Sequence, residues 1–424
     1  MSEILPSLAK ILRQVKMTSL DIDFVRNQFP AFQSDELKGQ AFFENAGGSY
    51  TCRQVIDRLN RFYTHRKVQP YGAYPVSQLG GEEMDEARYR LAGLMGVKPD
   101  QLNFGPSTTQ NTYVLAKAFS QALTKGDVVI VTNQDHEANS GPWRRLSEDG
   151  IDIREWSVDP ETGHLNIESL KNLLDEKVKL VCFPHCSNIV GEINPVKEIV
   201  SIAHDAGAFV CVDGVSYAPH GFPNIGELKP DVYLFSSYKT YGPHQGIMVL
   251  SDNLNDYLPN QGHYFNSDHP TKRFTPAGPD HAQIAACAGM ADYFDIIHDH
   301  HFGAQSDASK RGQAVHDLFR AHEVNILQPL LDNLSSRNSV RLLGPADAEK
   351  RAPTVAVEVN SNGFEVAKKL SEKGINAGGG DFYAVRLLEA LNVDKANGAL
   401  RLSFVHYTTQ NEVSDLIRSL DELL

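Results

Sequence analysis

Lys239 follows an apolar run closely enough for its side chain to act as a nucleophile. The run Asp231–Phe235 has strand character, and three residues, Ser236 to Tyr238, separate it from the lysine. Burial near a strand end disfavours the charged form of a lysine, and the neutral amine can attack an aldehyde. A lysine after a strand is more often a solvated loop residue, so the chemical interpretation depends on the residues that accompany it.

Asp213 ends a second apolar run, Phe209–Asp213, and Gly214 follows it. A carboxylate at the end of a buried strand is costly unless a cation pairs with it. A protonated pyridine nitrogen would be such a cation, and the pair would keep the ring an effective electron sink. A metal ligand or a helix cap is the alternative, but no second carboxylate or histidine stands nearby at a matching spacing.

Three hydroxyl-bearing residues, Ser107, Thr108 and Thr109, follow the short predicted strand Leu102–Phe104 and open a helix that begins near Gln110. The free backbone N–H groups at such a helix start, together with hydroxyls, form an anion site that suits a phosphate. A plain helix cap is the alternative. The absence of a Gly-x-x-x-x-Gly-Lys-Ser/Thr pattern argues against a nucleoside triphosphate.

Polar residues stand just past five predicted strand ends. They are Ser107–Thr109, His136, Asn188, Asp213 and Ser236–Lys239. In an open α/β sheet, ligands bind outside the carboxyl ends of the strands, so these side chains would converge on one pocket. There, the imidazole of His136 could stack on a flat ring or transfer protons, although a lone loop histidine is more often incidental.

The elements that must position these residues alternate between strands and helices. Strand character is found at 128–132, 179–183, 209–213, 231–235 and 246–250, with helical periodicity between several of these runs. This alternation predicts an α/β fold with a mainly parallel sheet covered on both faces. After about residue 300, a strand over 354–358 and helices near 364–373 and 412–424 indicate a smaller α+β domain.

From about Phe42 to the C-terminus, the chain resembles the class V aminotransferase family of fold-type I pyridoxal 5'-phosphate (PLP) enzymes. Within that family it is most similar to the group II cysteine desulfurase branch, on the segments Asp135–Trp143, Ser187–Pro195 and Leu400–Thr408. The resemblance implies a seven-stranded-type PLP-transferase sheet and a homodimer with its site near the interface. We expect an N-terminal arm over 1–30, a large PLP-binding domain over 31–297 and a small C-terminal domain over 298–424.

The resemblance also implies roles for individual residues. The catalytic residues would be Lys239, which holds the cofactor covalently, Asp213, which pairs with the pyridine nitrogen, and His136, which stacks on the ring. The cofactor-binding set adds Ser107, Thr108, Thr109, Asn188, Ser216, Ser236 and Tyr238 to those three. The substrate-binding set is Arg401, Asn45 and Asn188, and an arginine fork suits two-point contact with an α-carboxylate. No metal-binding residue is predicted.

The chain departs from the desulfurase branch at the nucleophilic cysteine. The corresponding stretch, Gly378–Ala384, contains no cysteine, and Ser216 and Pro279 replace a glutamine and a threonine of that branch. Without a thiolate, a persulfide cannot form by the desulfurase route. The stretches Gly379–Ala384 and Val405–Thr408 resemble instead a cysteine desulfurase-like subgroup that lacks the cysteine, and this resemblance implies a transferase or a lyase.

Three functions remain open on the sequence. We favour an aminotransferase that acts on a small amino acid or amino-acid derivative. A PLP-dependent C–S lyase, acting by β-elimination on a cysteine derivative, is the alternative. An inactive scaffold protein is less favoured, because a scaffold needs none of Lys239, Asp213, His136 and Arg401, and a nicotinamide dehydrogenase lacks its Gly-x-Gly-x-x-Gly motif.

Composition and cysteine content indicate a cytoplasmic protein, and the family resemblance implies a small-molecule substrate. The net charge of −13 gives no broad attraction to nucleic acid or to an anionic membrane. No apolar run approaches the ~20 residues of a spanning helix. The five cysteines are too few and too scattered for a disulfide framework or a zinc site, and they suit a reducing compartment as buried side chains.

Three other features are ambiguous. Residues 1–16 have an apolar stripe at helical spacing, which fits a packing arm or a transit peptide. The run His298–His301 could hold a metal but more closely fits an ordinary helix end. His263 and His281 stand in loops that could line the pocket.

Overall fold

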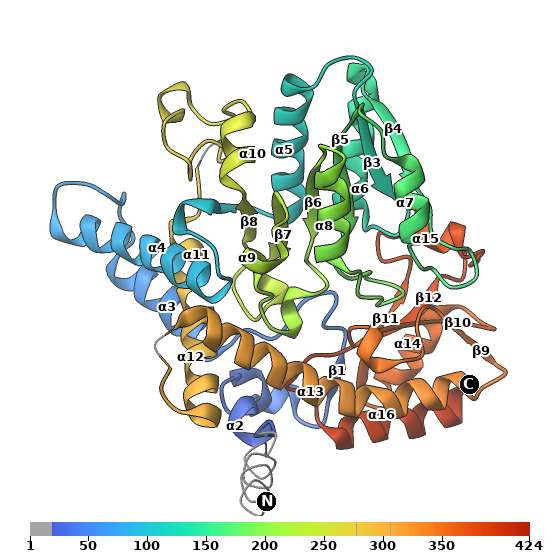
Figure 1. Ribbon diagram of the computed structural model, residues 1–424. Coiled ribbons are helices and arrows are strands. Elements are labelled where there is room, and N and C mark those ends of the chain that lie inside the picture. Colours follow the sequence, from blue (N-terminus) through green and yellow to red (C-terminus); the bar gives the residue numbers. More distant parts are fainter. Residues whose placement is uncertain (1–18, 277, 306) are drawn as a thin grey trace, which may run out of the picture.

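A seven-stranded sheet forms the centre of the computed structural model, which describes residues 19–276, 278–305 and 307–424 (Figure 1). In spatial order its strands are β2 (Leu102–Gly105), β8 (Gly246–Leu250), β7 (Val232–Ser236), β6 (Phe209–Asp213), β5 (Val178–Pro184), β3 (Val128–Thr132) and β4 (Asp152–Trp156). The strands from β7 to β4 pair in parallel, whereas β8 is antiparallel to both of its neighbours. The predicted α/β fold with a mainly parallel sheet is confirmed.

Both faces of this sheet are covered by helices, because its strands are apolar on both sides. In β3, Val129 and Val131 pack with α5 (Thr108–Ala122) and α6 (Glu137–Arg144), while Ile130 belongs to the core on the opposite face. That opposite core includes α8 (Val196–Asp205), and Figure 1 shows α5 and α8 at different depths beside the sheet. Continuous apolar strands of this kind are typical of buried parallel sheets.

Further helices surround the sheet and build the C-terminal part. They are α2 (Ile22–Arg26), α3 (Arg53–His65), α4 (Pro75–Leu94), α7 (Ile167–Leu173), α9 (Ile225–Leu228), α10 (Asp252–Tyr257), α11 (His281–Ala286), α12 (Ala288–Phe302), α13 (Ala308–Ser335), α14 (Gly363–Ser371), α15 (Val385–Ala390) and α16 (Gln410–Leu423). The predicted boundary at 297/298 falls within α12, and the proposed division into domains stays a prediction.

A second sheet of five strands lies in the C-terminal part of the fold. Its spatial order is β1 (Ala41–Phe43), β11 (Ile375–Gly380), β12 (Ala399–Ser403), β10 (Thr354–Val359) and β9 (Val340–Leu342). β1 comes from the N-terminal part of the chain and pairs in parallel with β11. This pairing brings the turn that begins at Glu44 beside Arg401 on β12.

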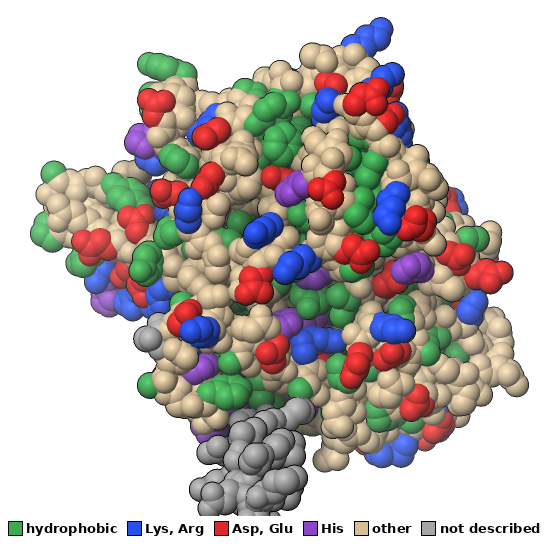
Figure 2. Space-filling view, viewed as in Figure 1, with side chains coloured by type: hydrophobic (Ala, Val, Ile, Leu, Met, Phe, Trp, Pro, Cys, Tyr) green, Lys and Arg blue, Asp and Glu red, His purple; other side chains and the backbone are tan. Residues whose placement is uncertain are grey.

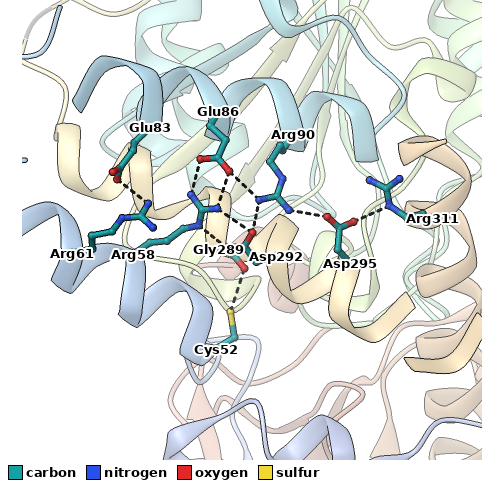
Figure 3. A network of polar contacts seen from close by, with 10 residues as sticks. All are labelled: Cys52, Arg58, Arg61, Glu83, Glu86, Arg90, Gly289, Asp292, Asp295 and Arg311. Carbon is teal, nitrogen blue, oxygen red and sulfur yellow. Dashed lines mark hydrogen bonds and ion pairs between the residues drawn. The ribbon is translucent and has the colours of Figure 1, made fainter. Parts of the chain in front are cut away.

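A network of ion pairs joins four of the helices (Figure 3). Arg58 of α3 binds Glu86 of α4 and Asp292 of α12, with a distance of 2.8 Å from Nη2 to Glu86 Oε1. Arg90 of α4 contacts the same two carboxylates and also Asp295, at 2.7 Å. Asp295 in turn accepts from Arg311 of α13 at 2.8 Å. The network therefore fixes these helices on one side of the molecule.

The structure describes only part of the predicted N-terminal arm, residues 1–30. Residues 1–16 lie outside the described residues. Beyond them, Asp21 accepts a hydrogen bond from His300 at 2.9 Å, and the ring of Phe24 stacks on His300 with centroids 3.7 Å apart. The run His298–His301 therefore packs against the segment before α3, and no metal-binding cluster occurs among the residues that the structure describes. In the same part of the chain, no helix combines the length and apolar character needed to cross a membrane.

Candidate active site

One cavity lies at the carboxyl ends of the central strands, where ligands bind in open α/β sheets. All ten residues predicted to bind the cofactor line it. They are Ser107, Thr108, Thr109, His136, Asn188, Asp213, Ser216, Ser236, Tyr238 and Lys239. The sheet thus brings together side chains that are far apart in the sequence, as expected for the carboxyl edge of an α/β sheet.

Lys239 ends a short 3-10 turn, Ser237–Lys239, directly after β7. Burial lowers the pKa of Lys239 to about 8, and the positive charge of Arg401 acts in the same direction. The charges of Asp213 and Glu44 oppose this effect. At neutral to mildly alkaline pH, a substantial fraction of the lysine is therefore a neutral amine, the form that can attack a carbonyl group.

Asp213 is the last residue of β6 and is 5% exposed. Burial raises the pKa of Asp213 to about 6, although the Val215 N–H group donates to its Oδ1 at 2.8 Å and Lys239 lies within range of its charge. That backbone N–H is the one hydrogen-bond donor to this carboxylate that we find in the described chain. A buried acid with so little compensation is suited to a cationic ligand such as a protonated pyridine ring.

The hydroxyl-bearing turn before α5 has the geometry of an anion site. Ser107 caps the helix by accepting from the Gln110 N–H group at 3.2 Å, and the hydroxyls of Thr108 and Ser236 are 2.8 Å apart. Gly246 of β8 passes directly behind this turn, and a Cβ atom there would lie 2.5 Å from the carbonyl carbon of Ser107. The capping and anion-binding interpretations of this turn are therefore compatible.

His136 is neutral in this environment. It caps α6, and the Ala138 N–H group donates to its Nδ1 at 3.0 Å, which leaves the proton on Nε2. Burial lowers the pKa of His136 to about 3, and the charges of Lys239 and Arg401 lower it further. A neutral imidazole at the cavity wall is better suited to stacking on a ring than to acting as a cation.

A second hollow adjoins the cavity and contains Arg401. The two spaces share His136, Asn188, Tyr238 and Lys239, among other residues. Arg401 is 4% exposed and donates to Glu44 Oε1 at 2.7 Å and to the backbone oxygen of Asn188 at 3.3 Å. The Phe382 ring centroid lies 3.8 Å from its guanidinium carbon. Burial lowers the pKa of Arg401, and Glu44 opposes that shift.

Asn45 does not line this hollow, and its role in substrate binding stays a prediction. Its side chain donates to the backbone oxygen of Ser403 at 3.4 Å and accepts a hydrogen bond from Tyr407. Asn45 therefore fixes the turn, whereas its neighbours Glu44, Ala46 and Gly47 line the hollow. Neither His263 nor His281 lines either of these two spaces.

Sequence reasoning gave no role to Glu44, Phe382 or His244. Glu44 precedes Asn45, and Phe382 lies within the stretch Gly378–Ala384, but their contact with Arg401 depends on the pairing of β1, β11 and β12. His244 lines the cofactor cavity, and its ring stacks on Tyr238 with centroids 4.8 Å apart. The short separation of His244 from Lys239 in the sequence could have indicated that His244 lines the same cavity.

All five cysteines are buried and unpaired, as predicted. Cys186 borders the cavity, but burial raises the pKa of its thiol to about 12, and the thiol donates to the backbone oxygen of Gly191 at 3.2 Å. Since the thiolate is the reactive form, Cys186 cannot replace the missing desulfurase nucleophile.

This donor set fits PLP. The N-terminus of α5 and its hydroxyls suit the phosphate, and the buried Asp213 carboxylate suits the pyridinium nitrogen. Lys239, with its lowered pKa, suits the aldehyde, and the neutral ring of His136 suits the face of the heterocycle. The phosphate, the ring nitrogen, the aldehyde and the ring face of the cofactor thus each have a matching partner in one cavity.

Comparison with known proteins places the chain in a family. The family model "Aminotransferase class-V" matches residues 41–262 and 313–416. "Aminotransferase-like protein FGM3" of Gibberella zeae is 32% identical, over 96% of this chain and 99% of its own length. "Cysteine desulfurase-like protein ustD" of Aspergillus flavus is 29% identical, over 96% and 91%. The chain belongs to the class V aminotransferase family of PLP-dependent enzymes, and PLP is its cofactor.

The fold agrees with solved structures. The apo structure of a cysteine desulfurase from Thermococcus onnurineus NA1 matches with a TM-score of 0.82 at 22% identity, covering 95% of this chain and 97% of the other. At that identity the match supports the fold alone. The predictions of family, cofactor and enzyme class are therefore confirmed, and the roles of individual residues stay proposals.

Proposed function

We propose that the protein is an aminotransferase that acts on an α-amino acid or a derivative of one. The observation that carries this proposal is the position of Lys239, a lysine of lowered pKa that faces both the cofactor cavity and the hollow containing Arg401. An amino acid whose carboxylate is bound by Arg401 would place its α-carbon near the lysine amine. Bound PLP supplies the electron sink that makes the α-proton acidic.

The residues of the chain would then divide the work. Arg401 would bind and orient the α-carboxylate, while the neutral Lys239 amine would remove the α-proton and deliver it to the cofactor carbon that is bound to the amino nitrogen. Asp213 holds a proton on the ring nitrogen, and His136 covers one face of the ring. The hydroxyls of Thr108 and Ser236 hold the phosphate. No step requires a thiolate, which agrees with the absence of a cysteine in 378–384.

A second candidate is β-elimination from a cysteine derivative. The names of several relatives favour it, because proteins called cysteine desulfurase, including one from Serratia proteamaculans at 27% identity, align over most of this chain. The same proton removal by Lys239 would expel a sulfur substituent from the neighbouring carbon, and the missing cysteine would not be needed.

The experiment that tests the proposal is absorption spectroscopy of the PLP-loaded protein, before and after addition of amino acids and cysteine conjugates. Aminotransfer predicts permanent loss of the visible cofactor band with release of one equivalent of keto acid. β-Elimination predicts recovery of that band while pyruvate and ammonia accumulate. The Lys239→Ala protein is the control, and its turnover should fall at least about a thousandfold because the nucleophile and base are gone. A protein that takes up no PLP would contradict both candidates.

We also propose a cytoplasmic homodimer with its site near the subunit interface. The family resemblance supports the dimer, and the buried, unpaired cysteines fit a reducing compartment. Light scattering of the purified holoprotein tests this proposal, since a monomeric mass at micromolar concentration would contradict it.

A further inference from the structure

Glu44 is a charged residue of the substrate-side hollow to which the proposed function gives no role. It directly follows β1, lines the hollow beside Arg401, and its side chain is 29% exposed. Within the described residues, we find one hydrogen bond to its carboxylate, from Arg401 Nη2 at 2.7 Å. An ionised carboxylate can accept about four. Glu44 is therefore under-partnered.

The carboxylate of Glu44 is held in a notch formed by glycines. Its Oε2 atom is buried and has no donor among the residues that the structure describes. A Cβ atom at Gly378 would lie 2.3 Å from Oε2, and one at Gly47 would lie 3.0 Å from Oε1. The absence of a side chain at Gly378 thus leaves room for the carboxylate in the position where it contacts Arg401.

A second carboxylate at Arg401 would unbalance the charges there. If Arg401 binds the α-carboxylate of the substrate, one buried guanidinium faces two carboxylates, because Glu44 already contacts it at 2.7 Å. Charges withdrawn from water are costly unless they are paired. A positive group on the substrate would restore the balance and supply the donors that Glu44 lacks.

We propose that Glu44 selects amino acids whose side chain carries a cation, such as an ammonium or guanidinium group. This inference rests on the proposed function, because it takes Arg401 as the site of the α-carboxylate. The hollow offers about 1240 Å³ of open space, and the rings of Tyr113 and Tyr383 also line it. Aromatic faces favour cationic groups and the aliphatic stems that carry them.

The test uses L-arginine and L-citrulline, which have the same length but differ in the charge of the side chain. Binding of each is measured by calorimetry to the PLP-loaded Lys239→Ala protein, in which turnover is blocked. With Glu44 intact, we expect arginine to bind at least about tenfold more tightly than citrulline, as for a close charge pair in a partly buried site. The additional change Glu44→Gln should bring this ratio to about one.

Glu137→Gln, on the same Lys239→Ala background, is the matched control. Glu137 lines the same hollow, but its side chain is 52% exposed and pairs with Arg386 at 3.4 Å instead of Arg401. The control should keep the preference for arginine. The inference is overturned if arginine and citrulline bind equally when Glu44 is intact, or if Glu137→Gln abolishes the preference as well. It is also overturned if Glu44→Gln tightens both ligands alike, because Glu44 would then merely compete for Arg401.

The proposed function and this inference can fail separately. If Glu44 determines the preference for arginine but the unaltered holoprotein releases no keto acid, aminotransfer is wrong and the selection stands. If keto acid is released while the binding ratio is one, the selection is wrong and aminotransfer stands.

Discussion

Two clusters of arginine and carboxylate side chains in this molecule differ in how completely they are paired. In the network between α3, α4 and α12, Glu86 and Asp292 each accept from both Arg58 and Arg90 (Figure 3). The hydrogen bond from Arg58 holds the pKa of Glu86 below its usual range despite partial burial. These charges satisfy one another.

The cluster around Arg401 is incomplete by comparison. Glu44 Oε2, Asn188 Oδ1 and Arg401 Nε are all buried without a hydrogen-bond partner in the described chain. Buried polar atoms are almost always paired in folded proteins, and exceptions mark strain, catalysis or a missing ligand. This difference indicates that the helix network stabilises the fold, whereas the Arg401 cluster is arranged to bind a ligand. On the outer surface, charges of both signs are scattered over the face that Figure 2 shows.

Among these substitutions, removal of the Arg401 guanidinium should have the largest effect on kcat/KM. The loss should arise mainly from weaker substrate binding. We expect Arg401→Gln to lower kcat/KM about 100- to 1000-fold, mainly through KM, because a buried charged contact to the substrate is lost. Steady-state kinetics with the best amino acid measures this. Since the substitution also leaves Glu44 without its partner, urea unfolding of the same variant is needed. A large increase in KM with little change in unfolding free energy would show that Arg401 serves substrate binding. A large loss of unfolding free energy with little change in KM would show instead that Arg401 serves the fold, and would contradict the comparison.

Replacement of Asp213 by asparagine, its neutral isostere, should stabilise the apoprotein. The folded-state pKa is about 6, above the ordinary value of 3.8, so the folded state binds more protons between those values and loses stability as pH rises through this window. The full cost, roughly 3 kcal/mol, is present above pH 6. Asp213→Asn should therefore raise the unfolding free energy of the apoprotein at pH 7 and have little effect at pH 3.5.

The same Asp213→Asn substitution should weaken catalysis by the PLP-loaded protein. Its amide cannot hold a proton on the pyridine nitrogen as a carboxylate does. Urea unfolding at the two pH values and turnover at pH 7 give both measurements. Unchanged apoprotein stability at pH 7 would show that the fold compensates this charge by other means.

Much of the cofactor cavity could be predicted because its residues follow strands whose sequences are unambiguous. The predicted runs 128–132, 209–213 and 246–250 coincide with β3, β6 and β8. Each of these runs has at least four consecutive apolar residues, a pattern that predicts a buried strand locally, and the edge where ligands bind follows from the sheet type. The positions of Asp213 and Lys239 thus required no knowledge of distant contacts.

The environment of Arg401 could not be predicted in this way. It depends on β1, a three-residue strand that pairs with β11 from the other end of the chain. So short a segment has no periodicity to detect. The direction of the Asn45 side chain could not be predicted for the same reason, because it is set by contacts with Ser403 and Tyr407, which lie far away in the sequence.

Disruption of the helix network should reduce stability without changing the site. Asp292→Asn removes a charge shared by Arg58 and Arg90, whose side chains are 11% and 24% exposed. Because these groups are partly solvated, we expect a loss of about 1–2 kcal/mol in unfolding free energy and no change in KM. Asp252→Asn is the control, since its pair with Lys98 is largely exposed and should contribute much less to the unfolding free energy. Equal losses in both variants would remove the distinction between paired networks and surface pairs.

The smallest effect is expected at Phe382, where the site cluster includes backbone strain. Phe382 has a φ of 53° and its neighbour Tyr383 a φ of 57°, values that cost an L-residue about 1–2 kcal/mol. Phe382→Gly relieves this strain but removes the ring that lies 3.8 Å from the Arg401 guanidinium. We expect stability to change by less than about 1 kcal/mol, since the two effects oppose each other, while KM rises several-fold because Arg401 is held less firmly.

Lys229→Gly is the control for that strain. Lys229 has a φ of 58° at the C-terminal cap of α9, and it lines neither the cavity nor the adjoining hollow. Glycine there should add up to about 1 kcal/mol of stability and leave KM unchanged. If Phe382→Gly behaves like Lys229→Gly in both measurements, the Phe382 ring does not position Arg401. The left-handed turn at 382–383 would then be a feature of the fold alone, and the contrast between the two clusters would rest on Glu44.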